Sequence, residues 1–282
     1  MTVIEAVLQG ILQGLTEFLP VSSSGHLSLF QHFFGISGSD AILSTVVMHL
    51  GTLVAVFIAF REKIAALIAE AFRLIADIFT GKFRFGEMNG NRRMIIMIII
   101  SILPLFAFYI FRDFFASLAS DDDIIAEGIS FIYTSVLLFL AIYFSKNNTK
   151  TSGEVTVRDA LFIGCMQGVA LLPGVSRSGS TIAAGMLSGL KREDAVEYGF
   201  ILGIPVIIAG AASELLEAHA ESAAVEVLPL IIGGVVAAVV GWLSIKLIKL
   251  LVVSDKFKIF AYYTGLLGLV VIAVGLTEKF AG

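Results

Sequence analysis

Long apolar segments alternate with short charged loops along most of the chain. Segments with at most one Asp, Glu, Lys or Arg occupy residues 41–60, 94–111, 124–144, 195–213, 227–247 and 258–276. A helix needs roughly 20 apolar residues to cross a hydrocarbon core of about 30 Å. Charged or Gly/Pro-containing loops bound each of these segments. The pattern therefore predicts six transmembrane helices.

Two further apolar segments differ, because a cluster of Pro, Gly and Ser interrupts each of them. They span residues 2–35 and 157–190, and the interruptions lie at about 20–25 and 173–179. Residues of these types stop a helix and favour tight turns. Each segment is therefore expected to form a pair of half-helices.

The two interrupted segments match each other without gaps at an offset of 154 residues. The matches include polar and small residues that chance similarity between membrane helices explains poorly: Thr2 with Thr156, Gly10 with Gly164, Gln13 with Gln167, Gly14 with Gly168, Ser22 with Ser176, Ser24 with Ser178 and Gly25 with Gly179. We infer an internal duplication, with repeat one at 1–150 and repeat two at 151–282. The four glycines near the start of the segments are expected to allow close helix contact.

The charge of the connecting loops orients the predicted spans. Basic residues concentrate in 61–93, 146–158, 191–192 and 246–258, whereas acidic residues concentrate in 113–123 and 214–226. By the positive-inside rule the basic loops are cytoplasmic and the acidic loops lie outside. These assignments agree only if both interrupted segments are re-entrant, with 2–35 entering from outside and 157–190 from the cytoplasm. The repeats then have inverted topology, and both termini are expected on the outer side.

Composition supports this class of protein and excludes others. The chain has 282 residues, of which 57% are hydrophobic and 15% are charged, well below the roughly 25% charged residues of soluble domains. A formal net charge of -4 offers no basic field for nucleic acid, and the single Cys165 excludes a disulfide framework. The expected fold is all-α: one membrane domain with six transmembrane helices plus two re-entrant helical hairpins.

The interruptions carry polar residues that membrane helices rarely hold. The first contains Glu17 and His26 around a run of serines, and the second contains Arg177 between two serines. An ionisable group at membrane depth is costly and marks a functional site. Each turn also leads into an apolar helix, whose N-terminus attracts an anion, and Arg suits bidentate phosphate binding. These features predict a site for phosphoryl transfer.

Through the strings at 13–26 and 173–181, the chain resembles the undecaprenyl-diphosphate phosphatase family over essentially its whole length. The resemblance implies hydrolysis of undecaprenyl diphosphate to undecaprenyl phosphate and phosphate, which recycles the lipid carrier of cell-wall synthesis and gives bacitracin resistance. It also implies the bacterial cytoplasmic membrane, a site open to the periplasmic side, and dependence on a divalent metal, Mg²⁺ or Ca²⁺. The fold that it implies agrees with the loop charges.

Carried onto this sequence, the family motifs imply a catalytic set and a diphosphate-binding set. The catalytic residues would be Glu17, Ser23, His26 and Arg177, and the diphosphate would contact Ser22, Ser24, Gly25, Gly174, Ser176, Ser178, Gly179 and Thr181. At the motif position where family members carry an acidic residue or Gln, this chain has Gln13. The amide of Gln13 cannot act as a carboxylate ligand or as a base. Glu17 is then the expected metal ligand, with the metal carried by the diphosphate.

The division of labour among the catalytic residues is open at this point. The nucleophile is Ser23 activated by Glu17 or His26, which we favour, or His26 itself, or a water activated by Glu17. His26 could also act as the acid that protonates the leaving phosphate. Arg177 would neutralise the transferring group in all three cases. His49 lies inside a predicted crossing, where it either pairs with another helix or takes part in the chemistry.

Transport of a polyprenyl phosphate lipid is the alternative function, because inverted repeats with re-entrant helices are typical of secondary transporters. The enzyme is favoured because a carrier needs charge neutralisation but no nucleophile beside an acid or base. The expected partners are a polyprenyl diphosphate lipid and the bilayer, without nucleic acid. A homodimer is compatible with the sequence.

Overall fold

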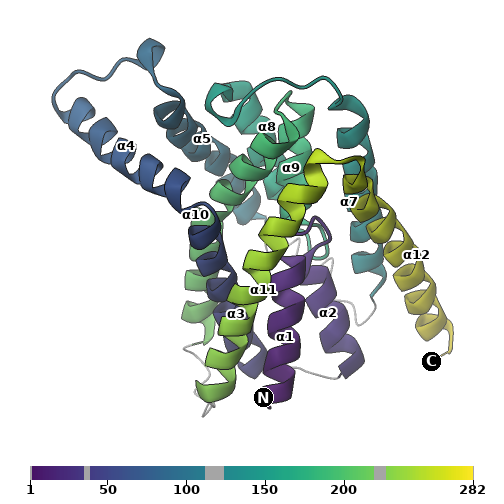
Figure 1. The fold of residues 1–282 in the computed structure, drawn as a ribbon. Helices are drawn as coiled ribbons and strands as arrows, with labels where there is room; N and C mark the ends of the chain where they lie inside the picture. The colour runs from purple at the N-terminus through teal and green to yellow at the C-terminus, as the bar shows by residue number, and fades with distance from the viewer. Residues whose placement is uncertain (1, 35–38, 112–123, 219–226, 282) are drawn as a thin grey trace.

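The computed structural model describes residues 2–34, 39–111, 124–218 and 227–281, and these residues form an all-helical bundle (Figure 1). The helices are α1 Val3–Thr16, α2 Ser23–Phe34, α3 Ser39–Ala59, α4 Arg61–Phe79, α5 Gly90–Ile110, α7 Ile125–Phe144, α8 Val157–Val169, α9 Arg177–Leu187, α10 Arg192–Ala218, α11 Val227–Val253 and α12 Lys258–Ala281. Within this part of the chain, α5, α7, α10, α11 and α12 are long and apolar enough to cross a membrane, and the bent pair of α3 and α4 makes a sixth candidate span.

The helix α4 is the main departure from the sequence prediction, which treated all of 61–93 as a connection. It meets α3 at 87°. One side of α4 is buried through Ile64, Leu67 and Leu74, whereas Phe79 on the other side is 87% exposed. The many charged residues at 61–93 concealed the amphipathic pattern of this helix in the sequence. One of these charges, Glu70, is buried and pairs with Arg92 at 2.8 Å. The acidic loop expected at 113–123 lies outside the described residues, as do residues 219–226 of the loop expected at 214–226. Residues 214–218 of that expected loop instead continue α10.

Each interrupted segment forms two helices, as the sequence predicts. Residues 17–22 separate α1 from α2, and residues 170–176 separate α8 from α9. In Figure 1 the first pair enters from the end of the molecule where both termini lie, and the second pair enters from the opposite end. The two turns meet, because the Ser178 hydroxyl donates to the Leu19 carbonyl at 3.1 Å.

Hydrogen bonds within the two segments recur at the same offset of 154 residues. Thr2 caps α1 and Thr156 caps α8, each in a capping box with the acidic residue three positions later. Ser22 and Ser176 each accept from the backbone N–H of the glycine three positions later, at 3.1 and 3.0 Å. Matching residues therefore make matching local structure. Ser22 also has a φ of 73°, a conformation that is uncommon for residues other than glycine.

The glycines of the first half-helices lie against other helices, as expected. A Cβ on Gly10 would lie 2.5 Å from the Gly233 carbonyl oxygen on α11, and a Cβ on Gly164 would lie 2.2 Å from the Ser101 carbonyl oxygen on α5. The predicted repeats divide at residue 150, so α11 belongs to the second half and α5 to the first. Helix α1 of the first half therefore packs on the second half, and α8 of the second half packs on the first. The two halves thus interlock.

Replacement of Gly164 by Val is expected to destabilise the protein by about 2 kcal/mol, because backbone atoms cannot move aside for the added carbons. Thermal unfolding of the purified protein in detergent measures the loss. Gly86→Ala is the control, since a Cβ there meets nothing within 4 Å. Equal unfolding midpoints for the two variants would contradict this packing.

Candidate active site

The candidate site lies where the two turns meet near the middle of the bundle. Glu17 directly follows α1, Ser23 begins α2 and Arg177 begins α9. The N-termini of α2 and α9 therefore both reach the same place. Helix N-termini attract negative charge through their dipoles and their backbone N–H groups. The fold thus brings together residues that are 160 positions apart in the sequence.

Glu17 is the centre of the site, and its side chain is only 3% exposed. One carboxylate oxygen, Oε1, accepts a hydrogen bond from Nη2 of Arg177. The other oxygen, Oε2, accepts from the Ser23 hydroxyl at 2.7 Å and from the Gln13 amide at 2.9 Å. A buried carboxylate needs such partners, because an uncompensated charge inside a protein is strongly destabilising.

His49 on α3 also belongs to the site, since its Nε2 lies 3.8 Å from Oε2 of Glu17. Its Nδ1 lies 2.9 Å from the Thr45 carbonyl within the same helix. The sequence left its role open, because an imidazole in a crossing either pairs between helices or takes part in the chemistry. The contact of His49 with Glu17 depends on the packing of α3 beside the first turn, which the sequence pattern does not show.

A cavity of about 190 Å³ adjoins these groups. Its polar wall is formed by Glu17, Ser23, Ser24, His49 and Arg177. Apolar residues of α10, among them Val206 and Ile207, also line the cavity. A lining with both charged and apolar residues suits a ligand with an anionic group attached to a hydrocarbon.

His26 does not line this cavity and turns instead toward α12. Its Nδ1 lies 2.7 Å from the Ser22 carbonyl and its Nε2 lies 2.7 Å from the Tyr263 hydroxyl. The carbonyl requires a proton on Nδ1, so in the neutral ring Nε2 accepts from the Tyr263 hydroxyl. The ring also packs edge-on against Phe131. In this arrangement His26 links the Ser22 turn to α12.

The other predicted phosphate contacts divide between the cavity and the scaffold. Ser24 reaches the cavity. Ser178 and Thr181 line a smaller pocket beside Glu17 and Arg177. Ser22, Ser176 and Gly179 are engaged in the turn hydrogen bonds already described. The remaining two predicted contacts pack against α7: a Cβ on Gly25 would meet Phe131 at 2.7 Å, and a Cβ on Gly174 would meet the Glu127 Cα at 3.0 Å.

The residues at the site do not form a protein-held metal site. In the described part of the chain there is no group of three or more His, Cys, Asp or Glu side chains placed to hold one ion. Among the described residues, Glu17 is the one carboxylate that lines this cavity, and Arg177 already contacts one of its oxygens. The Gln13 amide donates to the other oxygen.

Comparison with known proteins identifies the family. The model of the family described as "Bacitracin resistance protein BacA" matches residues 6–270. The chain belongs to this family. It is 35% identical over 280 residues to an undecaprenyl-diphosphatase of Carboxydothermus hydrogenoformans, covering 98% of both chains. It is also 36% identical over 279 residues to an undecaprenyl-diphosphatase of Desulforapulum autotrophicum, covering 98% of this chain and 99% of that one.

The contact between Glu17 and Arg177 predicts a specific pattern of stability. Arg177→Leu leaves the buried charge of Glu17 without its guanidinium and is expected to destabilise the protein by on the order of 3 kcal/mol. Glu17→Leu leaves Arg177, whose side chain is 24% exposed, without its carboxylate and should cost less. The double variant should lose clearly less than the sum of the two, because neither charge remains. Unfolding in detergent measures all three. Additive losses would show that the two side chains are not energetically coupled.

Proposed function

We propose that the protein is an undecaprenyl-diphosphate phosphatase of the bacterial cytoplasmic membrane. The observation that carries this proposal is the bridge made by Glu17, which contacts both a guanidinium and a serine hydroxyl beside a cavity. The names of the relatives indicate the substrate, undecaprenyl diphosphate. The charged and apolar residues that line the cavity suit the two chemical parts of this lipid. A diphosphate meets Arg177 and two helix N-termini, while the prenyl chain follows apolar side chains.

Substrate binding would rearrange the bridge. The diphosphate brings more negative charge than one carboxylate, and its oxygens suit the planar guanidinium of Arg177. Arg177 therefore changes partner from Oε1 of Glu17 to the phosphate. Glu17 keeps its hydrogen bond with Ser23 through Oε2, and the loss of the guanidinium makes this carboxylate a better proton acceptor. Binding and activation of the base are thus coupled.

In the chemical step, Ser23 attacks the terminal phosphorus. The bond between Oγ and phosphorus forms, the bond from phosphorus to the bridging oxygen breaks, and Glu17 takes the hydroxyl proton. Undecaprenyl phosphate leaves with the electrons of the broken bond, and the proton on Glu17 passes to it through solvent. In the second step Glu17 takes a proton from a water that attacks the phosphoserine, the bond between phosphorus and Oγ breaks, and Glu17 returns the proton to Oγ of Ser23 as phosphate leaves. Arg177 neutralises charge on the transferring group in both steps.

The geometry supports Ser23 over the two other nucleophiles that the sequence left open. The Ser23 hydroxyl already donates to the carboxylate at 2.7 Å. Attack by His26 would first require the ring to leave Tyr263 and turn toward the cavity. Attack by a water would leave the contact between Ser23 and Glu17 without a catalytic purpose. His26 instead positions the turn that carries Ser23.

The membrane arrangement that we propose follows the loop charges. The α1–α2 and α8–α9 pairs are re-entrant hairpins of two inverted repeats, 1–150 and 151–282, and the cavity lies near the midplane. Broken helices are tolerated at that depth where they are buried or line a wet cavity. Both termini then lie on the periplasmic side, to which the site opens. A divalent cation would enter with the diphosphate, since the described lining of the cavity offers it one carboxylate, that of Glu17.

Phosphate release from undecaprenyl diphosphate tests this proposal. Purified protein in detergent should release phosphate, and Arg177→Ala should lower the rate by about 100-fold or more through lost charge stabilisation. Glu17→Gln should lower it by about 100-fold or more through loss of the base. Ser23→Ala should be as severe, whereas the matched Ser244→Ala should retain the rate, since Ser244 only bonds its own helix. Assays with Mg²⁺, Ca²⁺ or EDTA establish the metal dependence.

Two results would contradict the proposal. A folded wild-type protein that releases no phosphate under any of these metal conditions would favour transport of the lipid phosphate. A Ser23→Ala variant with nearly full activity would exclude serine as the nucleophile and favour a water activated by Glu17.

A further inference from the structure

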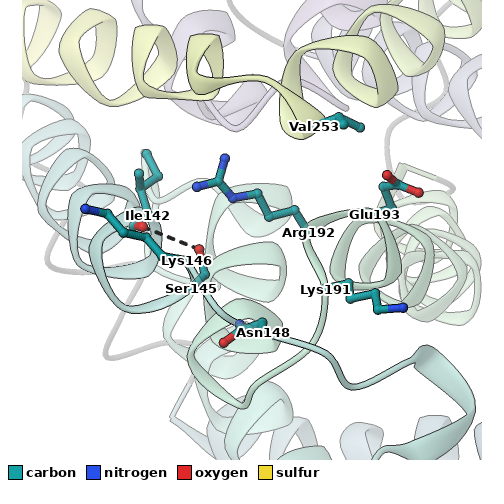
Figure 2. Close-up of a pocket in the computed structure, with 8 residues that line it drawn as sticks. All are labelled: Ile142, Ser145, Lys146, Asn148, Lys191, Arg192, Glu193 and Val253. Carbon is teal, nitrogen blue, oxygen red and sulfur yellow. Dashed lines mark hydrogen bonds between the residues drawn. The ribbon is translucent and has the colours of Figure 1, made fainter.

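A second cavity lies at the end of the bundle opposite the termini, and it shares no lining residue with the candidate active site (Figures 1 and 2). Its volume is about 560 Å³. The end of α7, the start of α10 and the end of α11 supply its walls. This is the end that carries the basic connections and that loop charge assigns to the cytoplasm.

Three basic side chains line this cavity against one acidic side chain: Lys146, Lys191 and Arg192 against Glu193. In Figure 2, Arg192 extends across the cavity toward the side where Lys146 lies, with Lys191 at the other end. None of the three basic groups forms an ion pair within the described part of the chain. By contrast, Lys150 pairs with Asp159 at 2.7 Å on the same end of the molecule. The lining of the cavity thus carries a net positive charge.

The walls of the cavity are held in place by hydrogen bonds. The Asn148 side-chain amide donates to the carbonyls of Met186 and Leu190 at 2.5 and 2.9 Å. The Lys191 backbone N–H donates to the Lys150 carbonyl at 2.9 Å. These bonds tie the connection after α7 to the connection before α10. The basic residues therefore lie on a fixed frame.

An apolar surface adjoins the basic cavity. Ile142 and Val253 line it, and the neighbouring Tyr143, Phe144 and Leu250 are 68%, 63% and 73% exposed. Helices α7 and α11 both qualify as membrane spans, so these side chains would face acyl chains. Tyrosine is enriched at the boundary between the hydrocarbon and the headgroups. The cavity is thus placed at headgroup level.

We propose that this basic cavity binds the phosphate headgroup of an anionic phospholipid of the cytoplasmic leaflet. Arg192 and Lys146 contact the phosphate, Lys191 adds charge at the rim, and the acyl chains follow the apolar surfaces of α7 and α11. Basic pockets between transmembrane helices on the cytoplasmic side suit such headgroups. The adjoining lipid-facing surface favours a lipid over a free phosphate ion.

Native mass spectrometry of the full-length protein, titrated with phosphatidylglycerol or phosphatidylcholine, tests the proposal. The wild type should bind phosphatidylglycerol in preference to phosphatidylcholine. The variant with Lys146→Gln, Lys191→Gln and Arg192→Gln should bind phosphatidylglycerol at least about tenfold more weakly, since each basic group near the headgroups contributes. The charge-retaining variant with Lys146→Arg, Lys191→Arg and Arg192→Lys should stay close to the wild type, which separates loss of charge from loss of fold.

A matched control removes three basic residues from the α4 region, with Arg73→Gln, Lys82→Gln and Arg84→Gln, and should keep the preference. An equal loss in this control would show general attraction of anions and overturn the site. Millimolar inorganic phosphate should not displace the lipid, and displacement would assign the cavity to a free anion. Equal binding of both lipids by the wild type would also contradict the proposal.

Discussion

The contact between Glu17 and Arg177 is the interaction on which the rest of the structure depends. It joins the turns of two helix pairs that enter the bundle from opposite ends. It also places one negative and one positive side chain inside a membrane bundle, where few charges are tolerated. Each charge is stabilised by the other until a ligand arrives. A phosphate that takes Arg177 away from Glu17 meets a carboxylate already bonded to Ser23. The same contact therefore serves the fold and, in our proposal, the chemistry.

The two halves have similar local structure but different side chains at matching positions. At the offset of 154 residues, Ser23 corresponds to Arg177, Glu17 to Leu171 and His26 to Ser180. The capping boxes and the serine-to-glycine turn bonds recur in both halves. A shared scaffold thus presents a carboxylate and a hydroxyl from one side and a guanidinium from the other. This difference produces a site that two identical halves would lack.

Much of this arrangement could be predicted from the sequence, because apolar length and loop composition determine membrane helices directly. The span expected at 258–276 lies within α12, and the interruption expected at about 20–25 overlaps residues 17–22, which separate α1 from α2. Sequence patterns did not predict the features that depend on how the helices pack. The helix α4 was hidden by its charges, and the partners of His49 and His26 lie 32 and 237 positions away in the chain. A pattern of neighbouring residues carries no signal for such pairings.

Binding of a non-hydrolysable diphosphate tests the central claim most directly, since it separates recognition from catalysis. A methylene-diphosphonate analogue of a prenyl diphosphate should bind the wild type and the Glu17→Gln variant, because Glu17 competes with the ligand for Arg177. Binding should weaken by about tenfold or more in Arg177→Gln, which lacks the charge-assisted hydrogen bonds. Equal affinity of Arg177→Gln and the wild type would contradict the account and place the diphosphate elsewhere in the molecule.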